Sequence, residues 1–291
     1  MNSRIEKYLD ELKAAMAGLD RSTIQDALAN AEDHLNAALQ AEMSENPGAS
    51  TGELVEKVIE QYGTPEDIRD VYSDIEEFTM PVFAKPVSKP AGKGFKGFLA
   101  VVGEPRAWAA CLYMILSLVT GIFYFTWAVT GFSTSVSLIV LIVGLPILLL
   151  FFLSLRGLGF VEGRLVEALL GVRMPRRAIV PHEGSWWDKF KIVFSTGTSW
   201  TTLVYMILMM PIGIAYFTIM VTLFSLGLSF IGAPLIQYVF NEPMIEPAIW
   251  IPIYGMPLVM AAGGLIIILT LHLAKFVASI HGRFAKAMLV S

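Results

Sequence analysis

The spacing of hydrophobic and polar residues divides the chain into two parts. Over residues 1–78, apolar residues recur every three or four positions among charged ones, a spacing typical of amphipathic helices that bury one face. From residue 107 onward, long runs without any charged residue replace this pattern. The chain therefore predicts an all-α protein, in which a small water-exposed helical domain precedes a membrane domain.

The N-terminal part contains start signals for four short helices. Ser3, Ser22 and Ser50 each stand three residues before a Glu or Gln, which is the capping-box pattern. Pro65 stands at the first position of the fourth helix, where its missing N–H costs nothing. Helices this short are not stable alone, so we expect residues 1–78 to fold as one packed domain.

The C-terminal part holds enough uncharged sequence for four membrane spans. The first uncharged run covers residues 107–155, a length of 49 residues, whereas one span needs about 20. Gly131 to Ser135 supplies the predicted turn within this run. Residues 224–249 are apolar but contain glycine and proline, and the sequence leaves open a helix extension, a re-entrant segment or an interfacial lid. The four spans are expected near residues 107–129, 136–156, 199–224 and 250–275.

The two pairs of predicted spans resemble each other in sequence. Residues 108–126 and 200–218 are identical at ten of nineteen positions, and Trp, Tyr, Gly, Tyr and Thr recur in one register. Chance similarity between apolar helices would not align these residues, so we expect an internal duplication that produced two hairpins. The expected repeats cover residues 107–175 and 199–291.

Charge separates the two parts further. Residues 1–80 hold 18 of the 25 acidic residues and only 6 of the 21 basic ones, whereas the remainder is net positive. With 55% hydrophobic and 16% charged residues overall, the composition excludes a typical cytosolic enzyme and direct nucleic-acid binding. Residues 79–106 are rich in Pro, Gly and Lys and predict a flexible linker. Because the bases lie between the second and third spans and after the fourth, both termini are expected in the cytoplasm.

One resemblance covers the N-terminal domain. Its first helix contains Tyr8-Leu9-x-x-Leu12, its second contains Ala31-Glu32-Asp33-His34, and the turn before its last helix reads Tyr62-Gly63-Thr64-Pro65-Glu66-Asp67-Ile68. Together these features resemble the HAAS domain, a helical signalling module of prokaryotic membrane regulators. The resemblance extends over roughly residues 5–75.

A second resemblance covers most of the membrane domain. Trp108 and Tyr113 open the first hairpin, Gly144-Leu-Pro146 lies in its second helix, and Leu169-Leu170-Gly171 precedes Pro175. This arrangement is similar to the sensor domain of prokaryotic regulators. The resemblance implies a regulator in the cytoplasmic (inner) membrane of a prokaryote. Such a protein would couple membrane state or an apolar ligand to a cytoplasmic partner such as a PadR-type transcription regulator.

The sequence is also compatible with an alternative function. The chain could be an accessory or scaffold subunit of a transport complex of the ABC-exporter type, with the transporter ATPase as its partner. We expect no enzymatic activity, catalytic residue, metal or cofactor, because the four histidines are scattered and only His272 falls inside a predicted span. The uncharged runs also lack an acid for proton or cation coupling. Self-association into a homo-oligomer stays open.

Two groups of residues are candidates for functional contacts. The polar side chains of the predicted spans form either an aromatic belt or a pocket between the hairpins for an apolar or lipid-like ligand. This first group is Tyr113, Tyr124, Thr126, Tyr205, Tyr216 and Thr218. Basic residues at the predicted cytoplasmic rim are expected to contact lipid headgroups or the acidic domain. This second group is Arg164, Arg173, Arg176, Arg177, Lys189 and Lys191.

Overall fold

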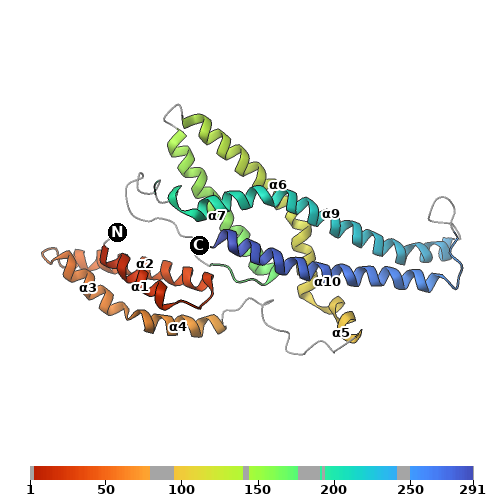
Figure 1. The fold of residues 1–291 in the computed structure, drawn as a ribbon, viewed down its shortest axis with the longest axis horizontal. Coiled ribbons are helices and arrows are strands. Elements are labelled where there is room, and N and C mark those ends of the chain that lie inside the picture. The colour runs from red at the N-terminus through yellow and green to blue at the C-terminus, as the bar shows by residue number, and fades with distance from the viewer. Residues whose placement is uncertain are drawn as a thin grey trace.

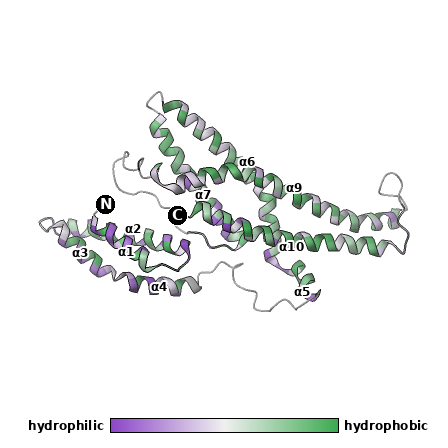
Figure 2. Cartoon of the chain, viewed as in Figure 1, coloured by the Kyte–Doolittle hydropathy of each residue, from purple (hydrophilic) through white to green (hydrophobic). Residues whose placement is uncertain are grey.

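The protein is all-α throughout the part that the computed structural model describes. Short helices come first along the chain, and long helices follow (Figure 1). Figure 2 shows polar residues concentrated on the short helices and apolar residues covering the long ones. The predicted fold class is therefore confirmed. The described residues are 3–78, 95–139, 144–175, 191, 194–240 and 250–290.

Four short helices form the N-terminal domain and share one core. Tyr8, Leu12, Leu35 and Val55 are buried in that core. The helices are present where their start signals predict them, and their apolar faces meet as expected. Their bounds are α1 Ser3–Ala15, α2 Arg21–Glu45, α3 Thr51–Tyr62 and α4 Pro65–Phe78.

Local chemistry sets the ends of these helices. The predicted cap at Ser22 is wrong, because the cap residue of α2 is Asp20, two positions earlier, and its Oδ1 accepts the Ser22 backbone N–H at 2.9 Å. Gly63 has a φ of 109°, which side chains rarely allow, so the chain turns sharply between α3 and α4. The Tyr8 hydroxyl donates to the Gly63 carbonyl at 2.8 Å. Burial raises the pKa of Tyr8 to about 12.

Four long helices follow, and each is long and apolar enough to cross a membrane. The chain is therefore a multi-pass membrane protein, as the uncharged runs predict. Each helix continues past the predicted C-terminal end of its span, because an uncharged run marks only the apolar part of a helix, whereas α7 and α10 begin later than predicted. The bounds are α6 Pro105–Leu138, α7 Gly144–Leu170, α9 Gly197–Phe240 and α10 Met256–Leu289.

One segment differs from its prediction, and a second decides between alternatives that the sequence leaves open. Gly131 to Ser135, predicted as a turn, lies inside α6, where the Ser135 hydroxyl donates to the Gly131 carbonyl at 2.7 Å. Glycine and serine favour turns in water, but in hydrocarbon a helix is preferred because it pairs every backbone group. The segment that begins at residue 224 extends α9 as far as Phe240 and contains Pro234 within the helix. Residues 241–249 lie outside the described part.

Part of the predicted linker is helical and packs against α10. The Phe98 and His272 rings stack with their centroids 5.0 Å apart, and the Lys275 Nζ donates to the Glu104 Oε2 at 2.5 Å. These contacts make the expectation of a flexible linker wrong for residues 95–106, whereas residues 79–94 lie outside the described part. The helical pieces are α5 Phe95–Leu99 and the 3-10 helix η1 Ala100–Gly103.

α6 and α9 cross at two glycines, Gly121 and Gly213. A Cβ at Gly121 would lie 2.4 Å from the Met209 carbonyl oxygen, and a Cβ at Gly213 would lie 2.2 Å from the Ser117 carbonyl oxygen. Away from the crossing, α6 pairs with α7 and α9 pairs with α10, and the two hairpins diverge (Figure 1). The two glycines are 92 positions apart and make reciprocal contacts, while the duplication itself stays a prediction.

Candidate functional site

A cluster of buried polar side chains lies where the four long helices meet. α6 and α9 each contribute two tyrosines, α7 contributes Glu162, and α10 contributes His281. Glu162 and His281 are 0% and 1% exposed, so their polar atoms depend on partners within the protein. We call this cluster the hub. Its residues are Tyr113, Tyr124, Glu162, Tyr205, Tyr216 and His281.

Glu162 is the acceptor at the centre of the hub. Its Oε1 accepts hydrogen bonds from the hydroxyls of Tyr113 at 2.5 Å and Tyr205 at 2.9 Å. Its Oε2 accepts from the Tyr124 hydroxyl at 3.1 Å. A buried carboxylate is costly unless such donors surround it. The three hydroxyls supply those donors, and the carboxylate thereby holds both α6 and α9 to α7.

His281 faces the same hydroxyls from α10. Its Nε2 lies 2.6 Å from the Tyr113 Oη and 3.2 Å from the Tyr205 Oη, and its Nδ1 lies 3.3 Å from the Tyr216 Oη. With the protons of Tyr113 and Tyr205 directed at Glu162, their oxygens can accept from an Nε2–H, and Tyr216 can donate to Nδ1. The neutral Nε2–H tautomer satisfies both ring nitrogens. Hydrogen bonds thus connect an acid and a base through tyrosine hydroxyls, a path along which a proton can move.

The hub corrects two expectations from the sequence. No buried carboxylate is expected from the uncharged runs, yet Glu162 is buried because α7 continues past Arg156. His281 likewise lies beyond the predicted end of the last span, and the sequence pattern points to His272 instead. The sequence contains a signal for both residues, since each directly precedes a Gly-Arg pair, at Gly163-Arg164 and at Gly282-Arg283.

The structure brings the four predicted tyrosines together, but it does not bring the two predicted threonines to them. Tyr113, Tyr124 and Tyr205 are buried, and all four tyrosine hydroxyls bond to Glu162 or His281. The threonines, Thr126 and Thr218, are exposed on α6 and α9. The tyrosines therefore connect the hairpins to each other, and their hydroxyls are already occupied by partners within the protein.

The predicted basic rim is described only in part. Arg164 donates to two backbone carbonyls of the segment that follows α7, and it pairs with Glu167 at 2.5 Å. In the described part of the chain, the Arg173 Nε and Nη1 atoms are buried without a hydrogen-bond partner, and Lys191 is exposed. The remaining three predicted residues, Arg176, Arg177 and Lys189, lie outside the described part.

The N-terminal domain contacts α10 through a base outside that predicted group. The Lys286 Nζ donates to the Asp20 Oδ1 at 2.6 Å, and both side chains are largely covered. Burial alone would raise the pKa of Asp20, but hydrogen bonds from Lys286 and Ser22 bring it below its usual value. The described contact of the N-terminal domain thus lies near the end of α10, and docking through the six predicted rim residues stays a prediction.

Comparison with known families agrees with both parts of the fold. A family model described as Putative sensor matches residues 113–289, more than half of the chain. The chain belongs to the Sensor family. A second family model, HAAS, matches residues 7–69, so an N-terminal HAAS domain precedes a Sensor domain with four long apolar helices. No curated protein and no solved structure matches the chain. All six hub residues lie within the Sensor match, and Asp20 lies within the HAAS match.

Proposed function

We propose that the protein is a non-enzymatic membrane signalling protein in which the Sensor domain controls the position of the HAAS domain. The two family matches support a membrane sensing role. The observation that carries the finer proposal is the position of α10, which supplies His281 to the hub and Lys286 to the HAAS contact. One helix therefore takes part in both the buried hub and the docking of the signalling domain.

The two contacts lie close together on α10. Lys286 lies five positions after His281, a distance of about 7.5 Å along a helix. A shift or rotation of α10 at the hub would therefore move Lys286 directly. The end of α10 is also held to α9, because the Thr201 hydroxyl donates to the Met288 carbonyl at 2.7 Å. A change in the hub would thus alter the helix pairing and the HAAS contact together.

Asp20 connects this contact to the stability of a HAAS helix. As the cap of α2 it accepts the Ser22 backbone N–H, and the same Oδ1 accepts from Lys286. A cap contributes about 1 kcal/mol to helix stability, whereas a partly exposed ion pair contributes about 0–1 kcal/mol. The docking contact is therefore weak enough to form and break reversibly, as a switch requires.

The proposal also includes a signal, a partner and an orientation. The signal is a membrane state or an apolar ligand, and the HAAS domain acts on a cytoplasmic partner such as a PadR-type transcription regulator. The bases between α7 and α9 and after the apolar part of α10 support cytoplasmic termini. The reciprocal contacts of Gly121 and Gly213 support a duplicated membrane domain. The resemblance to prokaryotic regulators supports a location in a prokaryotic inner membrane.

Neutralising the contact between Asp20 and Lys286 tests this function. Lys286→Gln removes the base, and Asp20→Asn removes the charge while keeping an oxygen that can cap α2. In the native host, both variants should change the transcript profile in the same direction. The double variant should change it no further, because both substitutions remove one interaction. Lys7→Gln, which removes an exposed pair with Glu11, is the matched control and should match the wild type.

An unchanged transcript profile would contradict the signalling role. The comparison requires that each variant is present in the membrane at the wild-type level, which immunoblotting of membrane fractions establishes. If Lys7→Gln changed the profile as much as Lys286→Gln, the effect would come from a general change in charge. The HAAS contact would then not be the output of the Sensor domain.

A further inference from the structure

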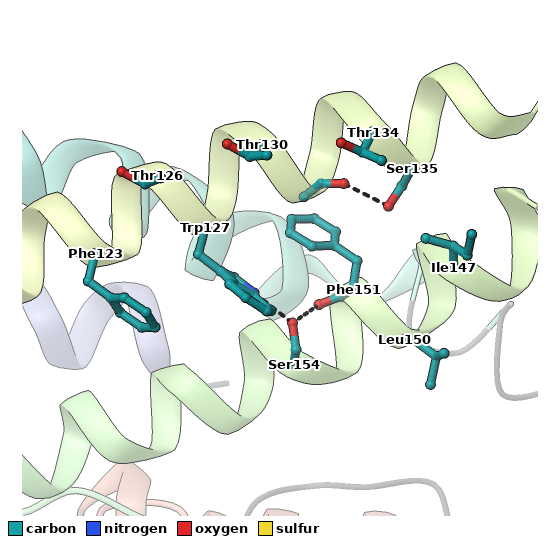
Figure 3. Close-up of a pocket in the computed structure, with 11 residues that line it drawn as sticks. Phe123, Thr126, Trp127, Thr130, Thr134, Ser135, Ile147, Leu150, Phe151 and Ser154 are labelled. Atoms are coloured by element: carbon teal, nitrogen blue, oxygen red, sulfur yellow. Dashed lines mark hydrogen bonds between the residues drawn. The ribbon is translucent and has the colours of Figure 1, made fainter.

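The α6–α7 hairpin contains a cavity near its closed end. The cavity has a volume of about 450 Å³ and lies between one face of α6 and one face of α7, within the range of small-molecule sites. Figure 3 shows the Trp127 indole and the Phe151 ring between the two helices. Both helices are candidate membrane spans, and wall residues such as Leu150 are exposed at 65%. In a membrane this cavity would therefore open toward lipid.

Hydrogen bonds within the protein occupy the polar side-chain atoms of Trp127, Ser135 and Ser154 in the cavity wall. The Trp127 Nε1 donates to the Ser154 Oγ at 2.9 Å, and that hydroxyl donates to the Phe151 carbonyl at 2.7 Å (Figure 3). The Ser135 hydroxyl donates to the Gly131 carbonyl. The interior of the cavity thus presents rings and aliphatic carbons, while threonine hydroxyls follow one edge of α6. Such a surface favours a hydrocarbon chain over a polar ligand.

The corresponding part of the other hairpin is packed more closely. A Cβ at Gly263 would lie 2.6 Å from the Gly227 carbonyl oxygen, so the backbones of α9 and α10 touch there. In the first hairpin, a Cβ at Gly131 would instead meet the Phe151 ring at 2.4 Å, because that ring fills the space between the helices. An aromatic wedge separates α6 from α7, whereas glycines close α9 onto α10. In the described part of the chain, the two hairpins therefore differ in how closely their helices approach at this level.

The cavity is connected to the hub through one turn of α6. The Phe123 ring lines the cavity and lies 6.2 Å from the Trp127 ring and 5.9 Å from the Tyr124 ring, between centroids. The Tyr124 hydroxyl donates to Glu162 in the hub. An occupant of the cavity that moves Phe123, directly or through Trp127, would therefore act on a ring that packs against Tyr124 of the hub.

We infer that this cavity is a binding site for one acyl chain of a bilayer phospholipid. The chain enters between α6 and α7 from the lipid, lies against Trp127, Phe151 and Leu150, and sets the spacing of the two helices. This inference deepens the proposed function by naming the class of ligand that the Sensor domain takes. The binding site itself does not depend on the proposed function; only the effect of binding on the HAAS domain rests on it.

Photocrosslinking of the full chain tests the site directly. The protein is reconstituted in phosphatidylcholine vesicles that contain a small fraction of phosphatidylcholine with a diazirine in one acyl chain, and labelled peptides are identified by mass spectrometry. Labelling should concentrate on residues 123–135 and 147–154. Leu150→Trp fills the cavity from α7 and should lower this labelling severalfold. Leu269→Trp, a change at the exposed position 119 residues further on, should leave it unchanged.

A second pair of variants keeps the test decisive if Leu150→Trp fails to fold. Thr130→Trp fills the cavity from α6, and Thr222→Trp is its control, 92 residues further on and exposed on α9. Labelling spread over the exposed faces of all four long helices, with no loss in the filled variants, would show ordinary surrounding lipid and overturn the inference. Because crosslinking does not depend on the HAAS domain, this failure is distinguishable from a failure of the Lys286→Gln test.

Discussion

A methyl group at the helix crossing should destabilise the Sensor domain. At Gly121 and Gly213 the added Cβ would lie 2.4 and 2.2 Å from backbone carbonyl oxygens of the opposite helix, whereas ordinary contacts begin near 3.4 Å. Backbone atoms cannot rotate away as a flexible side chain can, so α6 and α9 must separate by about 1 Å. Overpacking of this kind costs about 1–3 kcal/mol, and we expect Gly121→Ala and Gly213→Ala each to lose that much stability.

Glycines of the long helices with no neighbouring atoms at the Cβ position provide a matched control. A Cβ at Gly157 in α7 or at Gly232 in α9 would meet nothing within 4 Å. Replacing such a glycine with alanine should be neutral or stabilise the helix by up to about 1 kcal/mol. The four variants are compared by thermal unfolding in detergent, where 1 kcal/mol corresponds to a Tm shift of about 2–4 °C.

The combined variant sharpens this test. Gly121→Ala and Gly213→Ala act at one crossing, so a single separation of the helices relieves both clashes, and their effects should be less than additive. If Gly121→Ala and Gly213→Ala unfolded at the same temperature as Gly157→Ala, the backbones would not touch at the crossing. The reasoning about close contact between α6 and α9 would then be refuted.

The hub and the HAAS domain lead to three further predictions. Glu162→Leu leaves three tyrosine hydroxyls without their acceptor, and the loss of these hydrogen bonds within the membrane should lower the free energy of unfolding by about 2 kcal/mol. Glu162→Gln keeps the Oε1 acceptor and should lower the free energy of unfolding by less. Equal Tm values for the two variants would argue against the hydrogen-bonded hub. Because the pKa of Asp20 is lowered in the docked protein, its contribution to docking should be complete above its usual value of about 3.9 and lost as the pH falls through the lowered pKa. Crosslinking of the HAAS domain to α10 at pH 7 and in steps well below about pH 3.9 would detect this loss, and crosslinking that stays constant throughout the acid series would contradict it. A fragment of residues 1–78 should unfold cooperatively by circular dichroism, because its four helices share one core, and a gradual melt would count against an independent domain.

Much of the fold follows from patterns that the sequence displays openly. Capping signals and apolar spacing predict α1 to α4, and the uncharged runs predict four membrane helices. The repeated Trp-Tyr-Gly-Tyr pattern singles out the four tyrosines of the hub. These predictions succeed because helix periodicity and exclusion of charge are properties of short segments, which can be recognised without knowing what the segment contacts.

The rest depends on contacts between distant segments. Glu162 and His281 are polar residues outside the uncharged runs, and only the meeting of four helices shows that they are buried and partnered. Gly131 to Ser135 predicts a turn by its composition, but apolar surroundings favour a helix there. The contact between Asp20 and Lys286 joins residues 266 positions apart, and charge counts alone predict only that acidic and basic surfaces attract.

The distance between the HAAS domain and α10 tests most directly whether the hub controls HAAS docking. Spin labels at the exposed residues Lys13 and Arg283 would report it by double electron–electron resonance on the full chain in vesicles. A narrow distance distribution is expected for the wild type, and a broader one for Lys286→Gln, which removes the contact. Glu162→Leu should also broaden it, because the loss of the hub acceptor reaches Lys286 through α10. If Lys286→Gln broadened the distribution while Glu162→Leu left it as narrow as in the wild type, the hub would not control the position of the HAAS domain.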